Sequence, residues 1–457
     1  MSIIAMKFGG TSVADPDKIR AAAKRALAYQ KKGKSVVMVV SAMGKSTDLL
    51  EGLANDVMRG KSAPKREIDQ LLATGEQVTI SLMAMALEEM GTKAISFTAA
   101  QVGVMTNAAH TKARISHIDT RKLHKFLDSG HIVIVAGFQG ISPAGDVTTL
   151  GRGGSNVSLV AIAAALEAEV CENYSDVDGV FTADPRIVPD AKKINSISYD
   201  EMMELATQGV GVLHNRAVEI ASKYNVPIHL RNSQNNRKGT MIVTQDESME
   251  RIVVRGCALK EHIARITLRD VPNKPGVAAN IFHTIASGNV VVDDIIQTIS
   301  DDGQYAYIAF TIEYGDLADA KAIISKLCNK LDCYETYQMD LAKVSVVGIG
   351  MQMHTGVADQ MFKALAKAQV NIQNITTSEI KISCLIDEAH GPRALRVVHD
   401  AFDLGGKGTL LPKKKTKKAT KKTTKKKTTK KVTKKAAKKP VKKSAKKATK
   451  KKTTKKK

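Results

Sequence analysis

A chain of 457 residues is long enough for two or three domains. Its formal net charge is +25, but residues 413–457 carry 26 lysines and no acid. The net charge of residues 1–412 is therefore −1. The five cysteines form no CxxC pair and accompany no histidine cluster, which argues against a disulfide framework or a metal site. The N-terminus lacks the charged and apolar regions of a signal peptide, and no apolar run approaches the roughly 18 residues of a membrane span, so we expect a soluble cytoplasmic protein without membrane contact.

Residues 1–233 alternate short apolar runs with amphipathic stretches. We predict strands at Ile3–Phe8, Ser35–Val40, His131–Ala136, Glu169–Tyr174 and Val226–Leu230. Between them we predict helices that include Asp17–Lys31, Ile68–Glu89 and Asn156–Ala168. Strands that alternate with helices indicate an α/β sheet covered on both faces, in which ligands bind beyond the carboxyl ends of the strands.

An internal repeat follows a polar linker at residues 234–250. PGVAANIFHTIASGNVVVDDIIQTIS (275–300) aligns with TGVADQMFKALAKAQVNIQNITTSE (355–379) at a constant offset of 80 residues. Each copy begins with a predicted strand, at Ile263–Leu268 and at Lys343–Val347, and continues with a turn, a helix and another strand. We therefore predict two small α+β modules, at residues 251–340 and 341–412.

The last segment, residues 413–457, consists mainly of lysine, threonine and alanine without apolar periodicity. Self-repulsion and the lack of anything to bury predict a disordered tail.

The strongest local signal is Lys7-Phe8-Gly9-Gly10-Thr11-Ser12, at the end of the first predicted strand. Two glycines let backbone N–H groups approach a polyphosphate closely, and the following helix offers its positive end. Lys7 then lies where it could neutralise a transferring phosphoryl group. The alternative is a simple strand-to-helix turn with a solvated lysine.

A second glycine-rich segment is Thr149-Leu150-Gly151-Arg152-Gly153-Gly154-Ser155-Asn156, again between a predicted strand and a helix. Its arginine could bind a carboxylate in bidentate fashion. The alternative is an ordinary helix start with Ser155 or Asn156 as the N-cap.

Two further segments contribute candidates. In Tyr174–Arg186, Asp178-Gly179 is a hairpin turn signal, and the functional interpretation is a hairpin that holds a nucleotide with Arg186 near the phosphates. Thr74-Gly75-Glu76-Gln77 fits a capping box through Thr74 and Gln77, which leaves Glu76 free to face a substrate amine.

Taken together, KFGGTS (7–12), SAMGKSTD (41–48), ATGE (73–76), TTLGRGGS (148–155) and YSDVDGVFTADPR (174–186) resemble the aspartokinase family in order and spacing. The repeated module resembles the paired ACT domains that this family carries for feedback control. The resemblance implies an amino-acid-kinase-type α/β sandwich followed by two ferredoxin-like ACT modules. It also implies transfer of the γ-phosphate of ATP to the β-carboxylate of L-aspartate, the first step towards lysine, threonine and methionine.

The resemblance assigns roles residue by residue. It implies Lys7 and Asn156 as catalytic residues, and ATP, with Mg²⁺ carried by the nucleotide, at Lys7, Phe8, Gly9, Gly10, Ser175, Asp176, Phe181, Thr182, Ala183, Asp184, Pro185 and Arg186. It implies aspartate contacts at Ser41, Thr47, Glu76, Arg152, Gly153, Gly154 and Ser155. It implies effector contacts, for threonine and lysine, at Lys274, Pro275, Gly276, Val277, Ala278, Asp293, Gln297, Val357, Ala358, Asn371, Ile372, Ser378 and Glu379. Because ACT modules commonly pair between chains, it also implies a homo-oligomer.

The sequence departs from the family pattern at three positions. Asn156 stands where the family has aspartate, Gly211 where it has lysine, and Asn273 where it has an acid before Lys-Pro-Gly. The leading hypothesis is a feedback-regulated aspartokinase. Asn156 and Gly211 favour the alternative of a kinase-shaped ACT sensor without turnover, and Asn273 bears on lysine recognition. The lysine-rich tail alone suggests a third function, association with nucleic acid or other polyanions.

Overall fold

The structure, a computed structural model, describes residues 2–245, 253–288 and 290–406. The predicted tail and the last residues of the predicted linker lie outside this part of the chain. No helix among the described residues combines the length and the apolar character that crossing a membrane requires.

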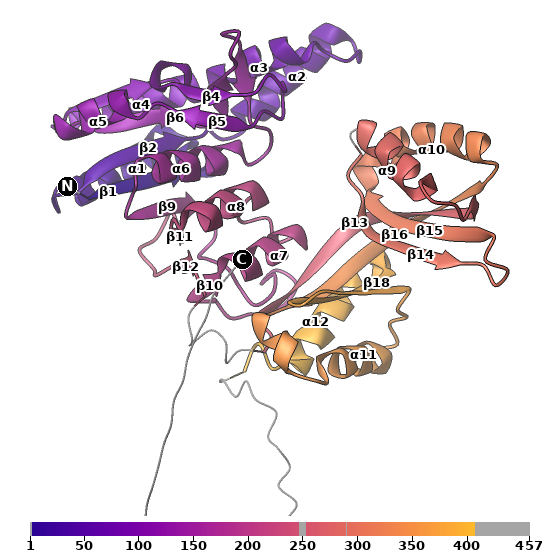
Figure 1. Ribbon diagram of the computed structural model, residues 1–457. Helices are drawn as coiled ribbons and strands as arrows, with labels where there is room; N and C mark the ends of the chain where they lie inside the picture. The colour runs from indigo at the N-terminus through magenta and orange to yellow at the C-terminus, as the bar shows by residue number, and fades with distance from the viewer. Residues whose placement is uncertain (1, 246–252, 289, 407–457) are drawn as a thin grey trace, which may run out of the picture. The chain divides into compact units, whose positions relative to one another are not determined.

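The N-terminal region is built on an eight-stranded sheet with the order β10-β12-β11-β9-β1-β2-β6-β3 (Figure 1). Its strands are β1 (Ile3–Phe8), β2 (Ser35–Val40), β3 (Ala94–Phe97), β6 (Ile132–Ala136), β9 (Val170–Ser175), β10 (Ser196–Ser198), β11 (Ile228–Asn232) and β12 (Thr240–Val243). All neighbouring pairs are parallel except β11 and β12. A smaller sheet, β5-β4-β7-β8, is formed by Val104–Thr106 (β4), Ile115–Ile118 (β5), Gln139–Ile141 (β7) and Val147–Thr149 (β8).

Helices cover both faces of the large sheet, as the alternating pattern predicts. The helices of this region are α1 (Pro16–Gln30), α2 (Ser46–Met58), α3 (Lys65–Leu72), α4 (Thr74–Glu89), α5 (Arg121–Asp128), α6 (Gly154–Ala165), α7 (Tyr199–Thr207) and α8 (Asn215–Tyr224). α1 and α4 pack on one face, whereas α5, α6, α7 and α8 pack on the other. The strands are buried on both sides, which is why they read as continuous apolar runs.

The alternation of side chains along β1 decides where its lysine points. Ile4, Met6 and Phe8 belong to the core beneath α1 and α4, whereas Ala5 belongs to the core beneath α6. Because side chains alternate along a strand, Lys7 faces the α6 side at the carboxyl end of β1. The fold therefore directs this cation towards the N-terminus of α6.

Two local predictions in this region are wrong. The predicted helix Ile68–Glu89 is two helices, α3 and α4, which meet at Ala73. The predicted capping box is absent from the start of α4: its N-cap is Ala73, and the Thr74 hydroxyl donates to the Leu71 carbonyl instead. Glu76 nevertheless has no capping role, as predicted.

The hairpin predicted at Asp178-Gly179 is not formed either. Chain reversal occurs farther on, since Phe181 bridges Lys193 across the intervening loop. The Asp178 carboxylate instead accepts hydrogen bonds from Asn232, Asn235 and Arg237 at 2.8, 2.8 and 3.0 Å. These bonds, which lower the pKa of Asp178, tie the segment after β9 to the segment after β11.

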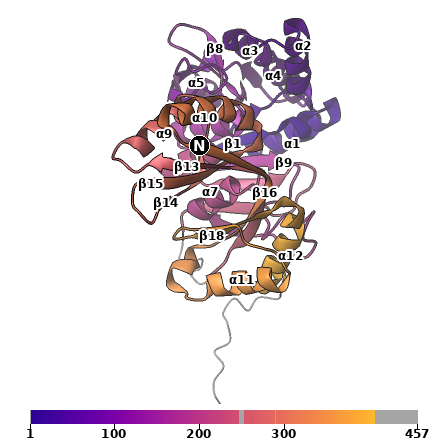
Figure 2. The ribbon, with the colours of Figure 1, turned by 90° about the vertical axis from the view of Figure 1, so that its right-hand side faces the viewer.

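The C-terminal region forms one six-stranded sheet with the order β14-β15-β13-β16-β18-β17. Its strands are β13 (Gly256–Pro272), β14 (Asp293–Ile299), β15 (Tyr305–Glu313), β16 (Tyr334–Val347), β17 (Asn374–Thr377) and β18 (Lys381–Asp387), and its helices are α9 (Val277–Ser287), α10 (Leu317–Leu331), α11 (Val357–Lys367) and α12 (Gly391–Ala401). Figures 1 and 2 show α9 beside α10 over one half of this sheet and α11 beside α12 over the other half.

The two halves reproduce the predicted repeat. α9 and α11 begin at Val277 and Val357, and each follows a glycine with positive φ, Gly276 at 90° and Gly356 at 101°. The long antiparallel pair β13 and β16 runs through both modules (Figure 1). Its consequence is an interleaved order: residues 256–260, expected in the first module, pair with residues 343–347 and supply the fourth strand of the second module.

Candidate active site

Every residue predicted to contact aspartate lines one cavity of about 400 Å³, which we call the catalytic cavity. Ser41, Thr47, Glu76 and the segment 152–155 are all in its wall, together with Lys7, Gly9, Gly10 and Asn156. It lies where β1 and β2 end and α6 begins, at the carboxyl edge of the parallel sheet. The structure therefore brings together segments that are more than a hundred residues apart in the sequence.

Lys7 is the buried cation of the catalytic cavity. Only 9% of its surface is exposed, and a side chain on Gly9 would place its Cβ 3.3 Å from the Lys7 ammonium nitrogen. Burial lowers the pKa of Lys7 to about 8, although the nearby carboxylate of Asp176 raises it. Because the Lys7 ammonium is buried in the wall of the cavity, it can interact strongly with an anion that enters the cavity.

Gly10 is required by packing. A Cβ at this position would lie 2.9 Å from the carbonyl oxygen of Ala42 and 3.0 Å from that of Gly44. The glycine lets the loop after β1 approach the loop after β2, and the Gly44 N–H donates to the Gly10 carbonyl at 3.0 Å.

Glu76 is a buried carboxylate with one free oxygen. One oxygen accepts the Ala42 N–H at 3.0 Å, whereas Oε2 has no hydrogen-bond partner among the described residues. Burial raises the pKa of Glu76 to about 7, and the bond from Ala42 only partly offsets this. A buried acceptor without a donor is costly, so this oxygen is suited to a ligand's N–H group.

The N-terminus of α6 forms another wall. Its N-cap is Gly153, at φ 69°, so neither Ser155 nor Asn156 caps the helix. The Ser41 hydroxyl donates to the Ser155 hydroxyl at 3.0 Å, which joins the end of β2 to this helix. Arg152 is exposed at the cavity and has no side-chain hydrogen bond within the described part of the chain, so its guanidinium is available for a carboxylate.

Asn156 projects from the first turn of α6 towards β9. Its side-chain oxygen accepts a long hydrogen bond, 3.5 Å, from Asn173, which lies directly opposite Lys7 in the sheet. The Asn173 oxygen is buried and has no partner among the described residues. Asn156 thus belongs to the polar surroundings of Lys7.

Residues 209–216 pack against the glycine-rich segment. A side chain at Gly153 would collide with the His214 ring, whose Cδ2 lies 2.6 Å from the expected Cβ. Arg216 donates to the Leu150 carbonyl at 2.7 Å. Neither Arg216 nor Arg186 lines the catalytic cavity, so neither takes the place of the lysine that the family has at position 211.

Residues that no sequence motif marks stabilise the wall of this cavity. Asp69 on α3 is fully buried and accepts hydrogen bonds from His110, from the Thr111 N–H and from the Thr149 hydroxyl, the last at 2.5 Å. Thr111 and Thr149 both line the catalytic cavity, as do Glu51 and Phe138. An aspartate inside an amphipathic helix gives no sequence signal for such a role.

Comparison with known proteins identifies the family. The model of the amino acid kinase family matches residues 2–232, and ACT domain models match residues 266–331 and 344–402. The aspartokinase of Pseudomonas aeruginosa is 46% identical over 407 residues, which cover 88% of this chain and 98% of that protein. The chain belongs to the aspartokinase family of enzymes.

Solved aspartokinase structures share the fold. Escherichia coli aspartokinase III in complex with aspartate and ADP (R-state) matches with a TM-score of 0.76 and 25% identity, over 88% of this chain and 99% of that one. The same enzyme in complex with lysine and aspartate (T-state) matches with a TM-score of 0.67 and 26% identity, over 87% and 99%.

The aspartokinase resemblance also implies ATP contacts outside the catalytic cavity. Phe8 is turned away from α6 and stacks on Tyr174, with ring centroids 4.7 Å apart. Ser175 donates to the Asp176 carboxylate at 3.0 Å, just beyond β9. The Asp184 carboxylate pairs with the exposed Arg186, and Pro185 between them is exposed.

Thr182 and Ala183 of the same loop contact the second ACT module. Ala183 belongs to the core of that module. The Thr182 hydroxyl lies 3.0 Å from Nε2 of His399, a fully buried residue of α12. Burial lowers the pKa of His399, which favours the neutral ring.

The implied effector residues occupy equivalent places in the two ACT modules. They lie at the turns into α9 and α11 (Lys274, Pro275, Gly276, Val277 and Ala278; Val357 and Ala358) and on or beside β14 and β17 (Asp293 and Gln297; Asn371, Ile372, Ser378 and Glu379). Lys343, which no sequence motif marks, is 1% exposed and pairs with Asp293 at 2.7 Å and with Asp294. Burial would raise the pKa of Asp293, but the hydrogen bond and charge of Lys343 lower it overall.

Proposed function

We propose that this chain transfers the γ-phosphate of ATP to the β-carboxylate of L-aspartate and forms 4-phospho-L-aspartate. The observation that carries the proposal is the catalytic cavity, in which the buried cation Lys7, the buried acid Glu76 and the free guanidinium of Arg152 line one space of about 400 Å³. Aspartate has one ammonium and two carboxylates, and these groups match that charge pattern.

For aspartate, the free oxygen of Glu76 supplies an acceptor for the ammonium. Arg152 binds a carboxylate in bidentate fashion. Thr47, Ser41, Ser155 and the backbone of the segment 153–155 line the remaining wall and provide polar contacts.

For ATP, the glycines at positions 9 and 10 leave the backbone open to the phosphates, and Lys7 compensates the charge of the transferred group. Ser175, Asp176 and the loop residues Phe181, Asp184, Pro185 and Arg186 would hold the rest of the nucleotide. Thr182 and Ala183 are buried against the second ACT module and would support the loop instead. Mg²⁺ would arrive with the nucleotide and neutralise phosphate charge. No group of three or more candidate metal ligands occurs among the described residues.

The reaction needs no general base from the protein, because the nucleophile is a carboxylate with an ordinary pKa of about 4 and is ionised at neutral pH. Asn156 can therefore orient the groups around Lys7 where the family has an aspartate. This removes one reason for regarding the chain as a sensor without turnover.

A coupled assay of ADP release separates the kinase from the sensor. We expect release to depend on L-aspartate and to saturate with its concentration. ADP release that is the same with and without aspartate, in a protein that still binds aspartate by calorimetry, would contradict the proposal and favour the sensor.

We further propose feedback inhibition through the ACT modules, with threonine more effective than lysine. Asn273 replaces an acid of the family and donates instead to the Gly303 carbonyl at 2.9 Å, in the turn between β14 and β15. Without that acid, the side-chain ammonium of the effector lysine lacks a carboxylate partner, and its binding should be weaker by about a few kcal/mol. Activity titrated with each amino acid tests this, and inhibition by lysine alone at low concentration would contradict it.

Two partner proposals remain. Pairing of ACT modules between chains would give a homo-oligomer, and sedimentation of the full chain tests this.

The 26 lysines of residues 413–457 would bind nucleic acid or other polyanions by counterion release, without sequence preference. DNA affinity that did not fall with added salt would contradict this mechanism.

A further inference from the structure

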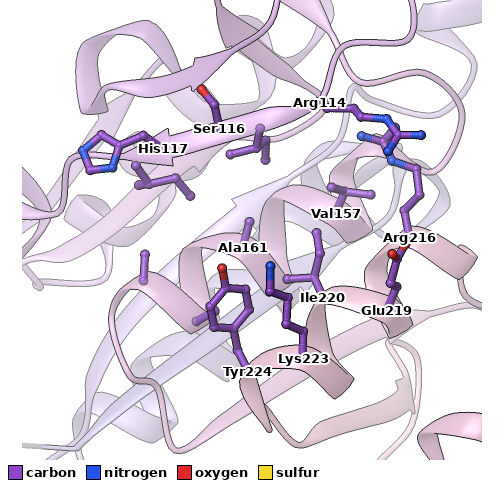
Figure 3. A pocket seen from close by; sticks show the side chains of 14 residues that line it. Arg114, Ser116, His117, Val157, Ala161, Arg216, Glu219, Ile220, Lys223 and Tyr224 are labelled. Carbon is purple, nitrogen blue, oxygen red and sulfur yellow. The ribbon is translucent and has the colours of Figure 1, made fainter.

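A second cavity, of about 460 Å³, lies between β5, α6 and α8 (Figure 3). We call it the β5–α8 cavity. It shares no lining residue with the catalytic cavity within the described part of the chain. Its volume lies in the range of pockets that bind small molecules, roughly 300–1,000 Å³.

The inner wall of the β5–α8 cavity is apolar. α6 contributes Val157 and the small side chains of Ala161, Ala164 and Ala165, which leave space between β5 and α8. Ile220 of α8 lies across this space, and the ring of Tyr224 borders it at the other end of α8 (Figure 3). This wall can bury an apolar group of several carbon atoms, and each Å² of apolar surface removed from water contributes about 25 cal/mol of favourable binding free energy.

The rim of the cavity is cationic. Arg114, Arg216 and Lys223 line it, and Glu219 is the only acid among the described residues that line it. Figure 3 shows the guanidiniums of Arg114 and Arg216 at one end of the cavity, with Glu219 nearer to the α8 end of the Arg216 side chain. Burial and the neighbouring charge of Arg114 lower the pKa of Arg216.

These two guanidiniums have donors left for a ligand. Arg216 donates to the carbonyls of Leu150 and Ala113, at 2.7 and 2.9 Å, which uses two of its five N–H groups. The Arg114 guanidinium has no hydrogen bond to another described residue. The charge of Glu219 partly offsets the lowering of the Arg216 pKa, but Glu219 forms no ion pair with either arginine in the described part of the chain. Two adjacent guanidiniums with free donors can bind a carboxylate through several charge-assisted bonds.

We propose that the β5–α8 cavity binds a small organic carboxylate with an apolar body. Its carboxylate lies between Arg114 and Arg216, and its body lies on the alanines of α6. The ligand then contacts Arg216, which also holds the Leu150 carbonyl immediately before the glycine-rich segment of the catalytic cavity. Ligand binding in the β5–α8 cavity is therefore connected to the glycine-rich segment of the catalytic cavity through the side chain of Arg216.

Calorimetry on the full chain with 4-phenylbutyrate as the probe tests the site. We expect 4-phenylbutyrate to bind at least tenfold more tightly than 4-phenylbutanol, which has a similar body without the charge, and more tightly than inorganic phosphate, which has no body. Arg114→Gln should weaken 4-phenylbutyrate about tenfold or more. Arg269→Gln, which removes an exposed arginine of β13 outside the cavity, should leave it unchanged.

A second variant tests the apolar wall. Ala164→Leu should abolish 4-phenylbutyrate binding by filling the cavity, while ADP release and the circular dichroism spectrum stay unchanged, because leucine is also a good helix former. The lysines of residues 413–457 are present in every variant, so they cannot account for differences between variants.

Several results would overturn the proposal. They are equal affinity for the alcohol and the carboxylate, equal affinity for phosphate, or the same affinity in the Arg114 and Arg269 variants. A self-association detected by sedimentation and lost in Arg114→Gln would also overturn it, because a second copy of the chain would then occupy the cavity.

Discussion

Glu76→Gln should weaken aspartate binding and also remove its dependence on pH. Glutamine keeps an oxygen for the Ala42 N–H but offers no negative charge to the substrate ammonium. A hydrogen bond to a charged group contributes about 1.5–3 kcal/mol, so we expect KM for aspartate to rise roughly 10- to 150-fold. The rate at saturating aspartate should change much less, because Glu76 contacts the substrate's ammonium and not the transferred phosphoryl group.

The pH dependence follows from the raised pKa of Glu76, about 7. Only the ionised carboxylate binds the ammonium, so the apparent affinity scales with the ionised fraction. That fraction falls about tenfold between pH 8 and pH 6, and the dissociation constant of aspartate should rise by the same factor. In Glu76→Gln it should be nearly constant over this range.

Calorimetric titration of aspartate at pH 6, 7 and 8 checks both statements, with Glu88→Gln as the control. Glu88 is an exposed residue of the same helix, so its variant makes the same change of charge away from the cavity. The same pH profile for wild type and Glu76→Gln would show that Glu76 does not bind the substrate ammonium. The same conclusion would follow if Glu88→Gln weakened aspartate binding as much as Glu76→Gln does.

Three other predictions concern the kinase and its contact with the second ACT module. Lys7→Ala should lower the rate of ADP release at least about 100-fold, while calorimetry still detects aspartate binding; wild-type turnover would disprove the role of Lys7. Gly211→Lys should raise turnover or leave it unchanged, because a Cβ at Gly211 meets no atom within 4 Å; a tenfold loss in the ADP-release assay would count against this. His399 has a lowered pKa, so the unfolded chain binds its proton more readily, and the free energy of unfolding should fall as pH decreases below about 6.5. His399→Gln should reduce that slope in denaturant titrations, and an unchanged slope would mean that His399 is not responsible.

The residues of the catalytic cavity were predictable where each motif adjoins a strand end. Lys7 lies at the carboxyl end of β1 and Ser41 directly follows β2, and the apolar runs predicted the bounds of both strands correctly. Parallel strands bring their carboxyl ends to one edge of the sheet. What the sequence could not give are contacts between distant segments. Asp69 stabilises Thr111 and Thr149 across gaps of 42 and 80 residues, and no local pattern marks it.

The incorrect local predictions have the same origin. Asp178-Gly179 has the composition of a hairpin turn, but Asn232, Asn235 and Arg237 bind its carboxylate from more than fifty residues away. The break at Ala73 interrupts an apolar pattern that continues on both sides, so periodicity alone predicted one helix. The β5–α8 cavity likewise needs three separated segments, and none of them contains a motif.

The interleaved strand order of the ACT modules has a consequence for how the chain can fold and be divided. Residues 256–260 leave the ribosome before the whole first module, yet they pair with residues 343–347, which follow it. Closing this long loop is slow, so the second module can be completed only after the first has brought its ends together. A fragment that began at Ile263 would lack this strand and would leave residues 343–347 of β16 as an unpaired edge, open to aggregation.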